Sequence, residues 1–179
     1  MPVTISNCAN NYGPYQFPEK VIPVFVTKLL QDERIPVYRS SDHRREWIQV
    51  VDHCRAIERI LASGKIGETY HVGTGVEASV SQIAAIVLDE LGAGADRIQT
   101  VEDRPGHDRR YVLDWTTIRR ELSWEPTVEF EKGLRETVRW YKANRGWWEP
   151  LLSRRLVKED QWTATPAANA ASNKTATRS

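Results

Sequence analysis

The stretch NNYGPYQFPEKVIP, from Asn10 to Pro23, decides how this chain is interpreted. It brings two adjacent side-chain amides, a Tyr-Gly-Pro turn, further aromatic rings and a Glu-Lys pair into one short segment. Asn and Gly accept unusual backbone conformations, while Pro14 and Pro18 fix φ and each remove a hydrogen-bond donor. A loop of this kind after a strand-like run, here Val3 to Ser6, is where an α/β protein places a ligand. A plain turn between a strand and a helix is the alternative that the chemistry alone leaves open.

Composition narrows the class of protein. The chain has 179 residues, enough for one domain with a core, and a net charge of +1, which gives no basis for binding nucleic acid or an anionic membrane. No apolar run approaches the ~20 residues of a membrane span, and the start does not resemble a signal peptide. Cys8 and Cys54 are expected to be buried thiols in a reducing compartment, which predicts a cytoplasmic location. The histidines lack metal-ligand spacing, so no metal site is expected.

The periodicity predicts strands alternating with helices, and therefore an α/β class with its sheet divided into small pieces. Strands are expected at 3–7, 34–38, 47–50, 68–72 and 98–101, and helices at 19–31, 53–63, 79–91, 114–122 and 130–141. Residues 8–18 and 39–46 are expected to be loops. Asp52 is the predicted N-cap of the second helix, whose buried face would be Ile57, Ile60 and Leu61, and Ser79 with Gln82 fits a capping box. Residues 1–150 form the predicted folded region, and 151–179 a mostly disordered tail.

Three further segments are candidates for chemistry. Gly73 to Ala78 matches the dinucleotide pattern G-x-G-x-x-A, but the predicted helix cap at Ser79 comes too late, so a loop near a substrate is the better interpretation. Residues 102–110, EDRPGHDRR, and the Arg44-Arg45 pair could bind phosphate, although the residues alone favour a solvated charged loop for the first, and a solvated loop is the alternative for the second. Neither Tyr12 nor Tyr15 is followed by a Lys four positions on, and no G-x-S-x-G occurs, so we expect no catalytic residue in this chain.

Several of these segments together resemble the dTDP-glucose 4,6-dehydratases, which are extended short-chain dehydrogenase/reductases of the NAD-dependent epimerase/dehydratase family. The resemblance runs from Pro2 to about Trp147. It is carried by NCANNYGPYQFPEK, the R-E-W-I-x-V-x-D-H run from Arg45, GETYHVG, DRPGHDRRY, WEP at Trp124 and the run ending at Tyr141. It implies an α/β fold comprising the end of the Rossmann sheet and the small substrate-binding domain.

The resemblance also implies roles for individual residues. Asn11 would contact NAD, Tyr38 would stack on the thymine that Pro36 to Tyr38 frame, and Arg45 would reach the diphosphate. The residues from Asp103 to His107 would close over the nucleotide, with Arg104 on phosphate. The complete set of implied substrate contacts is Asn10, Lys20, Val21, Pro36, Val37, Tyr38, Arg45, Ser79, Asp103, Arg104, Pro105, Gly106 and His107.

This chain departs from the family pattern in ways that matter. Ser40 and Ser41 are part of a turn where the family has Y-G-x-G, Glu46 stands where Asp is usual, and Ser79 occupies what is often an Asn. The family's NAD fingerprint, its Asp-Glu pair and its Tyr-x-x-x-Lys lie upstream of NCANNYGP. We therefore expect the C-terminal half of a longer enzyme, with NAD bound mainly by the other half.

That parent would convert dTDP-glucose to dTDP-4-keto-6-deoxyglucose by an internal NAD redox cycle, as a homodimer, and this chain alone would be inactive. The alternatives are a fragment of a UDP-sugar 4-epimerase or decarboxylase, and a non-catalytic remnant.

Overall fold

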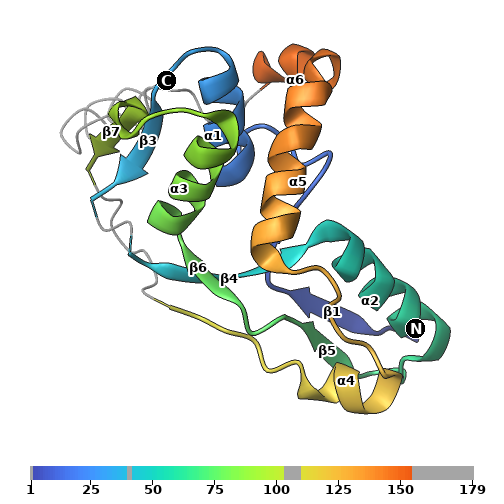
Figure 1. Cartoon of the computed structure of the whole chain (residues 1–179). Helices are drawn as coiled ribbons and strands as arrows, with labels where there is room; N and C mark the ends of the chain where they lie inside the picture. The colour runs from blue at the N-terminus through green and yellow to red at the C-terminus, as the bar shows by residue number, and fades with distance from the viewer. Residues whose placement is uncertain (1, 40–41, 103–109, 155–179) are drawn as a thin grey trace, which may run out of the picture.

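The computed structural model describes residues 2–39, 42–102 and 110–154, in which short strands alternate with helices (Figure 1). The strands are β1 (Ile5–Cys8), β2 (Asn10–Tyr12), β3 (Ile35–Tyr38), β4 (Arg44–Gln49), β5 (Thr69–Val72), β6 (Glu77–Ser79) and β7 (Ile98–Val101). The helices are α1 (Val21–Leu30), α2 (Val50–Ser63), α3 (Val80–Leu91), α4 (Thr116–Leu122), α5 (Phe130–Ala143) and α6 (Arg145–Leu152), with a 3₁₀ turn η1 (Ala95–Arg97). The predicted α/β class is confirmed.

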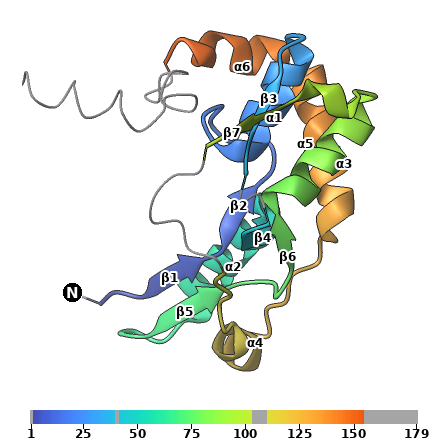
Figure 2. The ribbon, with the colours of Figure 1, turned by 90° about the vertical axis from the view of Figure 1, so that its left-hand side faces the viewer.

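Within the described ranges the strands form three small sheets, as the short strand–helix pairs predict. β1 pairs in parallel with β5, and β3 pairs in parallel with β7. β4 lies between β2, which runs parallel to it, and β6, which runs antiparallel. Ala9 alone separates β1 from β2, so the chain passes from the first sheet to the second across one residue (Figure 2).

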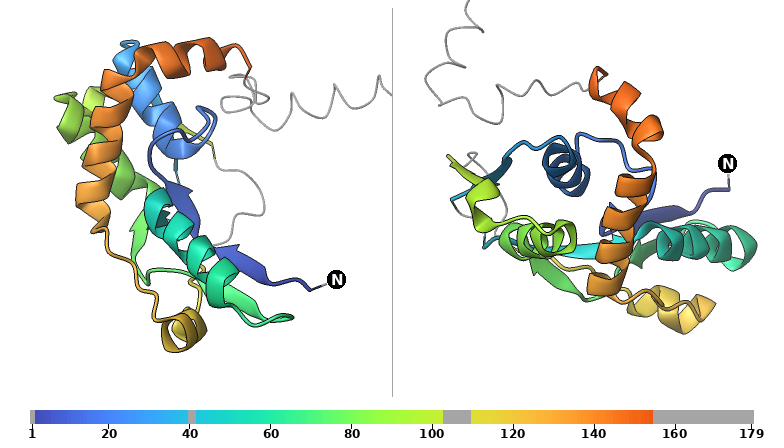
Figure 3. Two further views of the ribbon diagram at one scale, coloured as in Figure 1. Left: turned by 90° about the vertical axis from the view of Figure 1, so that its right-hand side faces the viewer. Right: turned by 45° about the horizontal axis from the view of Figure 1, so that its top comes forward.

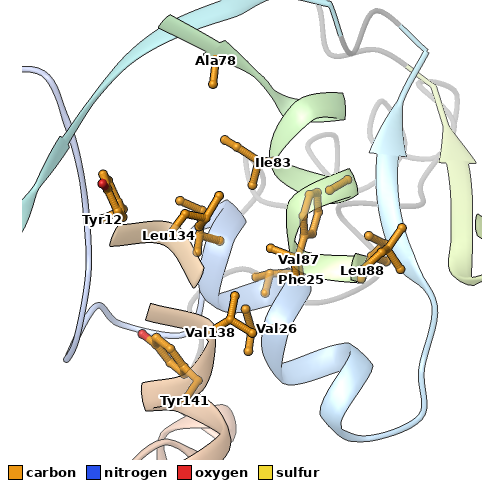
Figure 4. Close-up of a cluster of buried hydrophobic side chains, with 14 of the residues drawn as sticks. Tyr12, Phe25, Val26, Ala78, Ile83, Val87, Leu88, Leu134, Val138 and Tyr141 are labelled. Atoms are coloured by element: carbon orange, nitrogen blue, oxygen red, sulfur yellow. The ribbon is translucent and has the colours of Figure 1, made fainter. Parts of the chain in front are cut away.

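The larger core lies where α1, α3 and α5 meet. α1 is buried along six consecutive positions, from Ile22 to Thr27, because it is apolar on nearly every side and is enclosed by the other elements. Phe25 and Val26 of this helix pack with side chains of α3 and α5, and Tyr12 of β2 closes the cluster (Figure 4). This core supports the sheet formed by β2, β4 and β6.

A second core fixes the sheet of β1 and β5. The helices α2 and α4 pack around it (Figure 3), and Ile48, Tyr70 and Trp124 are among its buried side chains. Since β2 and β4 connect the two cores, the sheet containing β4 is the structural link between them. None of the helices in the described ranges is both long and apolar enough to cross a membrane.

Several predicted boundaries are confirmed and others are wrong. Ser79 and Gln82 form the complete capping box of α3, and Gly92 ends that helix in the left-handed conformation. The predicted loop at 8–18 contains β2, and β4 begins inside the predicted loop at 39–46. Both strands exist because they pair with partners distant in sequence, which local periodicity does not report. β6 and α6 were not predicted.

The predicted buried face of α2 is confirmed at Ile60 and wrong at Ile57 and Leu61. Leu61 is 82% exposed and Ile57 is 39% exposed, while Ala56 and Ile60 face the core. The N-cap is Gln49 rather than Asp52, because the helix begins earlier than predicted. The two cysteines are exposed rather than buried: Cys8 ends β1, a strand exposed along its length, and Cys54 lies on an exposed position of α2.

Asp52 lies in the first turn of α2 and is almost completely buried. Its carboxylate accepts hydrogen bonds from the backbone N–H groups of Thr127 and Val128, from the Thr127 hydroxyl and from Arg55, at 2.7 to 2.9 Å. Burial alone would raise the pKa of the Asp52 carboxyl, but these hydrogen bonds outweigh it and hold that pKa below its usual value. The carboxylate therefore fastens the segment before α5 to α2.

We expect Asp52→Ala to lower the free energy of unfolding by about 3 kcal/mol, because the donors of Thr127, Val128 and Arg55 that face this buried position lose their shared acceptor. Asp52→Asn should cost less, since the amide oxygen still accepts. Because the folded-state pKa is depressed, the stabilisation is present above the usual carboxyl pKa and is lost as the pH falls through the lowered value. Urea unfolding at neutral and acid pH measures this, with the exposed Glu58→Ala of the same helix as the control. Equal stability of the Asp52→Ala and Glu58→Ala variants at neutral pH would contradict the assignment.

Candidate functional site

β4 brings together three of the residues expected to bind a ligand. Its pairing with β2 places Asn10 opposite Trp47, and its pairing with β6 places Ser79 opposite Arg44, next to Arg45. Asn10 donates from Nδ2 to the carbonyl oxygen of the residue that follows Arg45, at 3.0 Å. The three candidates are far apart in sequence but share one small sheet.

The centre of this arrangement is the carboxylate of Glu46, which is completely buried. Its Oε1 accepts from the backbone N–H groups of Thr74 at 2.6 Å and Gly75 at 2.7 Å, and its Oε2 accepts from Leu113 N at 2.7 Å. Gly75 has a φ of +71°, which suits glycine. A Cβ on Gly73 would lie 2.5 Å from Oε1. The glycines of the G-x-G-x-x-A pattern thus form a cradle for a carboxylate of the protein itself.

Asn11 has its whole side-chain amide engaged. Its Oδ1 lies 2.9 Å from Nδ1 of His53, and its Nδ2 donates to the carbonyl oxygen of Ala9 at 3.1 Å and to Sγ of Cys8 at 3.2 Å. Because the amide oxygen only accepts, His53 donates from Nδ1. Partial burial lowers the pKa of His53, which favours the neutral ring. This network joins the end of β1, the start of β2 and the first turn of α2.

Arg45 is half-buried and carries a guanidinium without an acidic partner in the described part of the chain. Its Nη1 donates to the carbonyl oxygen of Arg44 at 2.9 Å, and its Cζ lies 5.5 Å from the ring centroid of Tyr111. The nearby carboxylate of Glu77 is taken by Arg110, which donates to both of its oxygens at 2.7 Å. Hydrogen bonding to Arg110 holds the pKa of Glu77 below its usual value. Arg45 is therefore a cation available to an anion.

The other expected residues are more dispersed. Lys20 is the exposed N-cap of α1, and Val21 is the first residue of that helix. The residues from Pro36 to Tyr38 belong to β3, in the sheet with β7 rather than the sheet of Arg45. The hydroxyl of Ser79 accepts from Gln82 N in the capping box. The expected contacts from Asp103 to His107 lie outside the described residues.

Sequence reasoning missed the contacts that Glu46 and Tyr111 make. Glu46 stood out only as a departure from a family pattern, although a charged residue followed by apolar Trp47 and Ile48 in a strand is a signal of an internal partner. The described residues include no group of three or more His, Cys, Asp or Glu side chains that could hold a metal ion.

Parallel strand pairs connected through helices define this chain as part of an α/β protein. The chain belongs to the family described as GDP-mannose 4,6 dehydratase, whose family model matches residues 1–137.

Individual relatives agree with this assignment. The chain is 49% identical over 166 residues to a dTDP-glucose 4,6-dehydratase of Streptomyces niveus, covering 93% of this chain and 48% of that protein. The crystal structure of DesIV, a dTDP-glucose 4,6-dehydratase from Streptomyces venezuelae with NAD bound, is similar with a TM-score of 0.81 and 52% identity, over 84% of this chain and 47% of that one. A UDP-glucose 4-epimerase of Thermotoga maritima is similar with a TM-score of 0.75 and 28% identity, over 81% of this chain and 47% of that one. The chain thus spans about half the length of these relatives.

We expect Glu46→Gln to lower the free energy of unfolding by about 2 kcal/mol, because an amide that accepts from Thr74 and Gly75 must turn its NH₂ group toward Leu113 N–H. Amide hydrogen exchange should become faster at Leu113 while Thr74 stays protected. Unchanged exchange at Leu113 would show that the carboxylate does not hold this segment.

A second variant tests the same cradle from the opposite side. Gly73→Ala places a methyl group against Oε1 of Glu46 and should also destabilise the fold, by about 1 to 3 kcal/mol. Gly146→Ala is the matched control, since a Cβ there meets no heavy atom within 4 Å. Thermal melts of the two alanine variants make the comparison, and equal melting temperatures would refute the close approach at Gly73.

Proposed function

We propose that this chain is the sugar-nucleotide-binding half of a longer dTDP-glucose 4,6-dehydratase. The observation that carries the proposal is the available guanidinium of Arg45 on the same small sheet as Asn10. The guanidinium fork matches the oxygens of a diphosphate, and the amide can bind either a phosphate or a sugar hydroxyl. Two relatives that are 49% and 51% identical to this chain are dTDP-glucose 4,6-dehydratases, which supports this choice of nucleotide.

The proposed reaction of the longer protein is the dehydration of dTDP-glucose to dTDP-4-keto-6-deoxyglucose. NAD, which is bound in the DesIV relative, would accept a hydride and be regenerated within each cycle. The G-x-G-x-x-A cradle holds the Glu46 carboxylate, and the side-chain amide of Asn11 is already hydrogen-bonded within the protein, which supports the proposal that the other half binds most of the NAD. We therefore assign to this chain the binding and orientation of the nucleotide sugar.

The surface of the β1 sheet supports a longer protein. Ile5 of β1 is 52% exposed, and Val51 and Leu61 of α2 are also exposed. One edge of β1 pairs with β5, and within the described residues no strand pairs with its other edge. Exposed apolar side chains and an open strand edge each favour burial by a further segment. The isolated chain is accordingly proposed to have no turnover, and turnover of dTDP-glucose by the purified 179-residue chain would refute this.

The second candidate is a half of a UDP-sugar 4-epimerase, favoured by the fold shared with the Thermotoga maritima enzyme. This chain is 28% identical to that epimerase and 52% identical to DesIV, so the epimerase is the weaker candidate. The two differ in the base that the chain must recognise, so titration with dTDP and with UDP separates them. A non-catalytic remnant would give no cooperative thermal melt and would bind neither nucleotide.

We expect the 179-residue chain to bind dTDP more tightly than UDP in isothermal titration at low salt. Arg45→Ala should weaken dTDP binding by at least tenfold, because the diphosphate loses a charge-assisted hydrogen-bond partner. Arg59→Ala, at an exposed position of α2, is the control and should bind like the unchanged chain. Tighter binding of UDP than of dTDP would favour the epimerase hypothesis. Binding of dTDP that Arg45→Ala leaves unchanged would exclude the proposed diphosphate site.

A further inference from the structure

Residues 110 to 113 are fastened to the β4–β6 pair at three points. Arg110 holds Glu77 of β6 through two hydrogen bonds, the ring of Tyr111 lies under the guanidinium of Arg45 of β4, and Leu113 N donates to Glu46 of β4. The first and third contacts fix the backbone on both sides of Tyr111. Its ring, 38% exposed, is thereby held against β4.

The stacked geometry suits an anion-binding arginine. The Cζ atom of Arg45 lies over the ring at 5.5 Å from its centroid, within cation–π range, so the ring attracts the guanidinium while the N–H groups directed away from the ring can donate to a ligand. One of the guanidinium N–H groups, on Nη1, donates to the carbonyl oxygen of Arg44. The stack also restricts a long side chain that would otherwise sample many rotamers, so less conformational entropy is lost when an anion binds.

The surrounding charges favour the same role. Glu46, adjacent in sequence, directs its carboxylate to backbone N–H groups of the interior, and Glu77 is neutralised by Arg110. Arg44 adds a like charge beside Arg45 on the strand. Among the described residues, the nearby carboxylates of Glu46 and Glu77 are thus occupied by other groups.

We propose that Tyr111 is a positioning residue that holds the Arg45 guanidinium for the diphosphate of the nucleotide sugar. This inference rests on the proposed function and extends it to a residue that does not itself bind the ligand. Tyr111 acts through its ring and not through its hydroxyl, so phenylalanine should replace it and a branched aliphatic residue should not.

The test is a double-mutant cycle on the 179-residue chain, with dTDP as the titrant at low salt. Tyr111→Leu should weaken dTDP binding about threefold to fivefold, and Tyr111→Phe should leave it unchanged. In an Arg45→Ala background, Tyr111→Leu should cause no further loss, because its effect runs through the guanidinium. A measurement without ligand accompanies the cycle: the Nε–H proton of Arg45 should show an upfield ring-current shift in NMR spectra that Tyr111→Leu abolishes and Tyr111→Phe retains.

Each outcome decides a separate question. Equal dTDP affinity of the Tyr111→Leu and Tyr111→Phe variants would overturn the positioning role. The role would also be overturned if Tyr111→Leu weakened dTDP binding by the same factor in the Arg45→Ala background as in the unchanged chain. Absence of the ring-current shift in the unchanged chain would also overturn it. If the unchanged chain shows that shift but binds no dTDP, the proposed function fails, and the role assigned to Tyr111 in binding fails with it.

Discussion

The buried carboxylate of Glu46 is the interaction on which the rest of the site depends. A charge removed from water is costly unless it is fully hydrogen-bonded, and here the donors are backbone N–H groups of two segments that are remote from β4 in sequence. The carboxylate therefore determines where the loop at 73–75 turns and where the chain returns at Leu113. Arg45 precedes it on β4 and Tyr111 lies two residues before Leu113, so the stack between them follows from the position of Glu46.

The same device occurs in the second core. Asp52 receives N–H groups from Thr127 and Val128 and holds the segment before α5, as Glu46 holds the segment before α4. In both cases a carboxylate replaces a regular strand or helix as the hydrogen-bond partner of an irregular segment. This explains how the described part of the chain, whose strands form three small sheets, keeps its long connections in place.

The parts of the fold that were predictable from sequence are those set by neighbouring residues. The capping box at Ser79 and the left-handed stop at Gly92 depend on side chains within one helical turn, so their residue types indicate them directly. β2 and β6 are three-residue strands that exist only because β4 pairs with both, and no local pattern reports such pairing. On α2, hydropathy correctly predicted that Ile60 is buried, but it also favoured Ile57 and Leu61, whereas Ala56 fills the core beside Ile60.

The glycine-rich loop shows why the candidate site was only partly predictable. The pattern G-x-G-x-x-A describes a backbone with exposed N–H groups, and such a concave set of donors binds any anion that reaches it. Whether that anion is a phosphate or an internal carboxylate depends on which side chain the neighbouring strand directs into the loop. Here that side chain is Glu46, so the glycine-rich loop binds a carboxylate of the protein and is held against β4. Arg45, next to it on β4, places its guanidinium over the Tyr111 ring instead, and the binding of an external anion is the role that we propose for it.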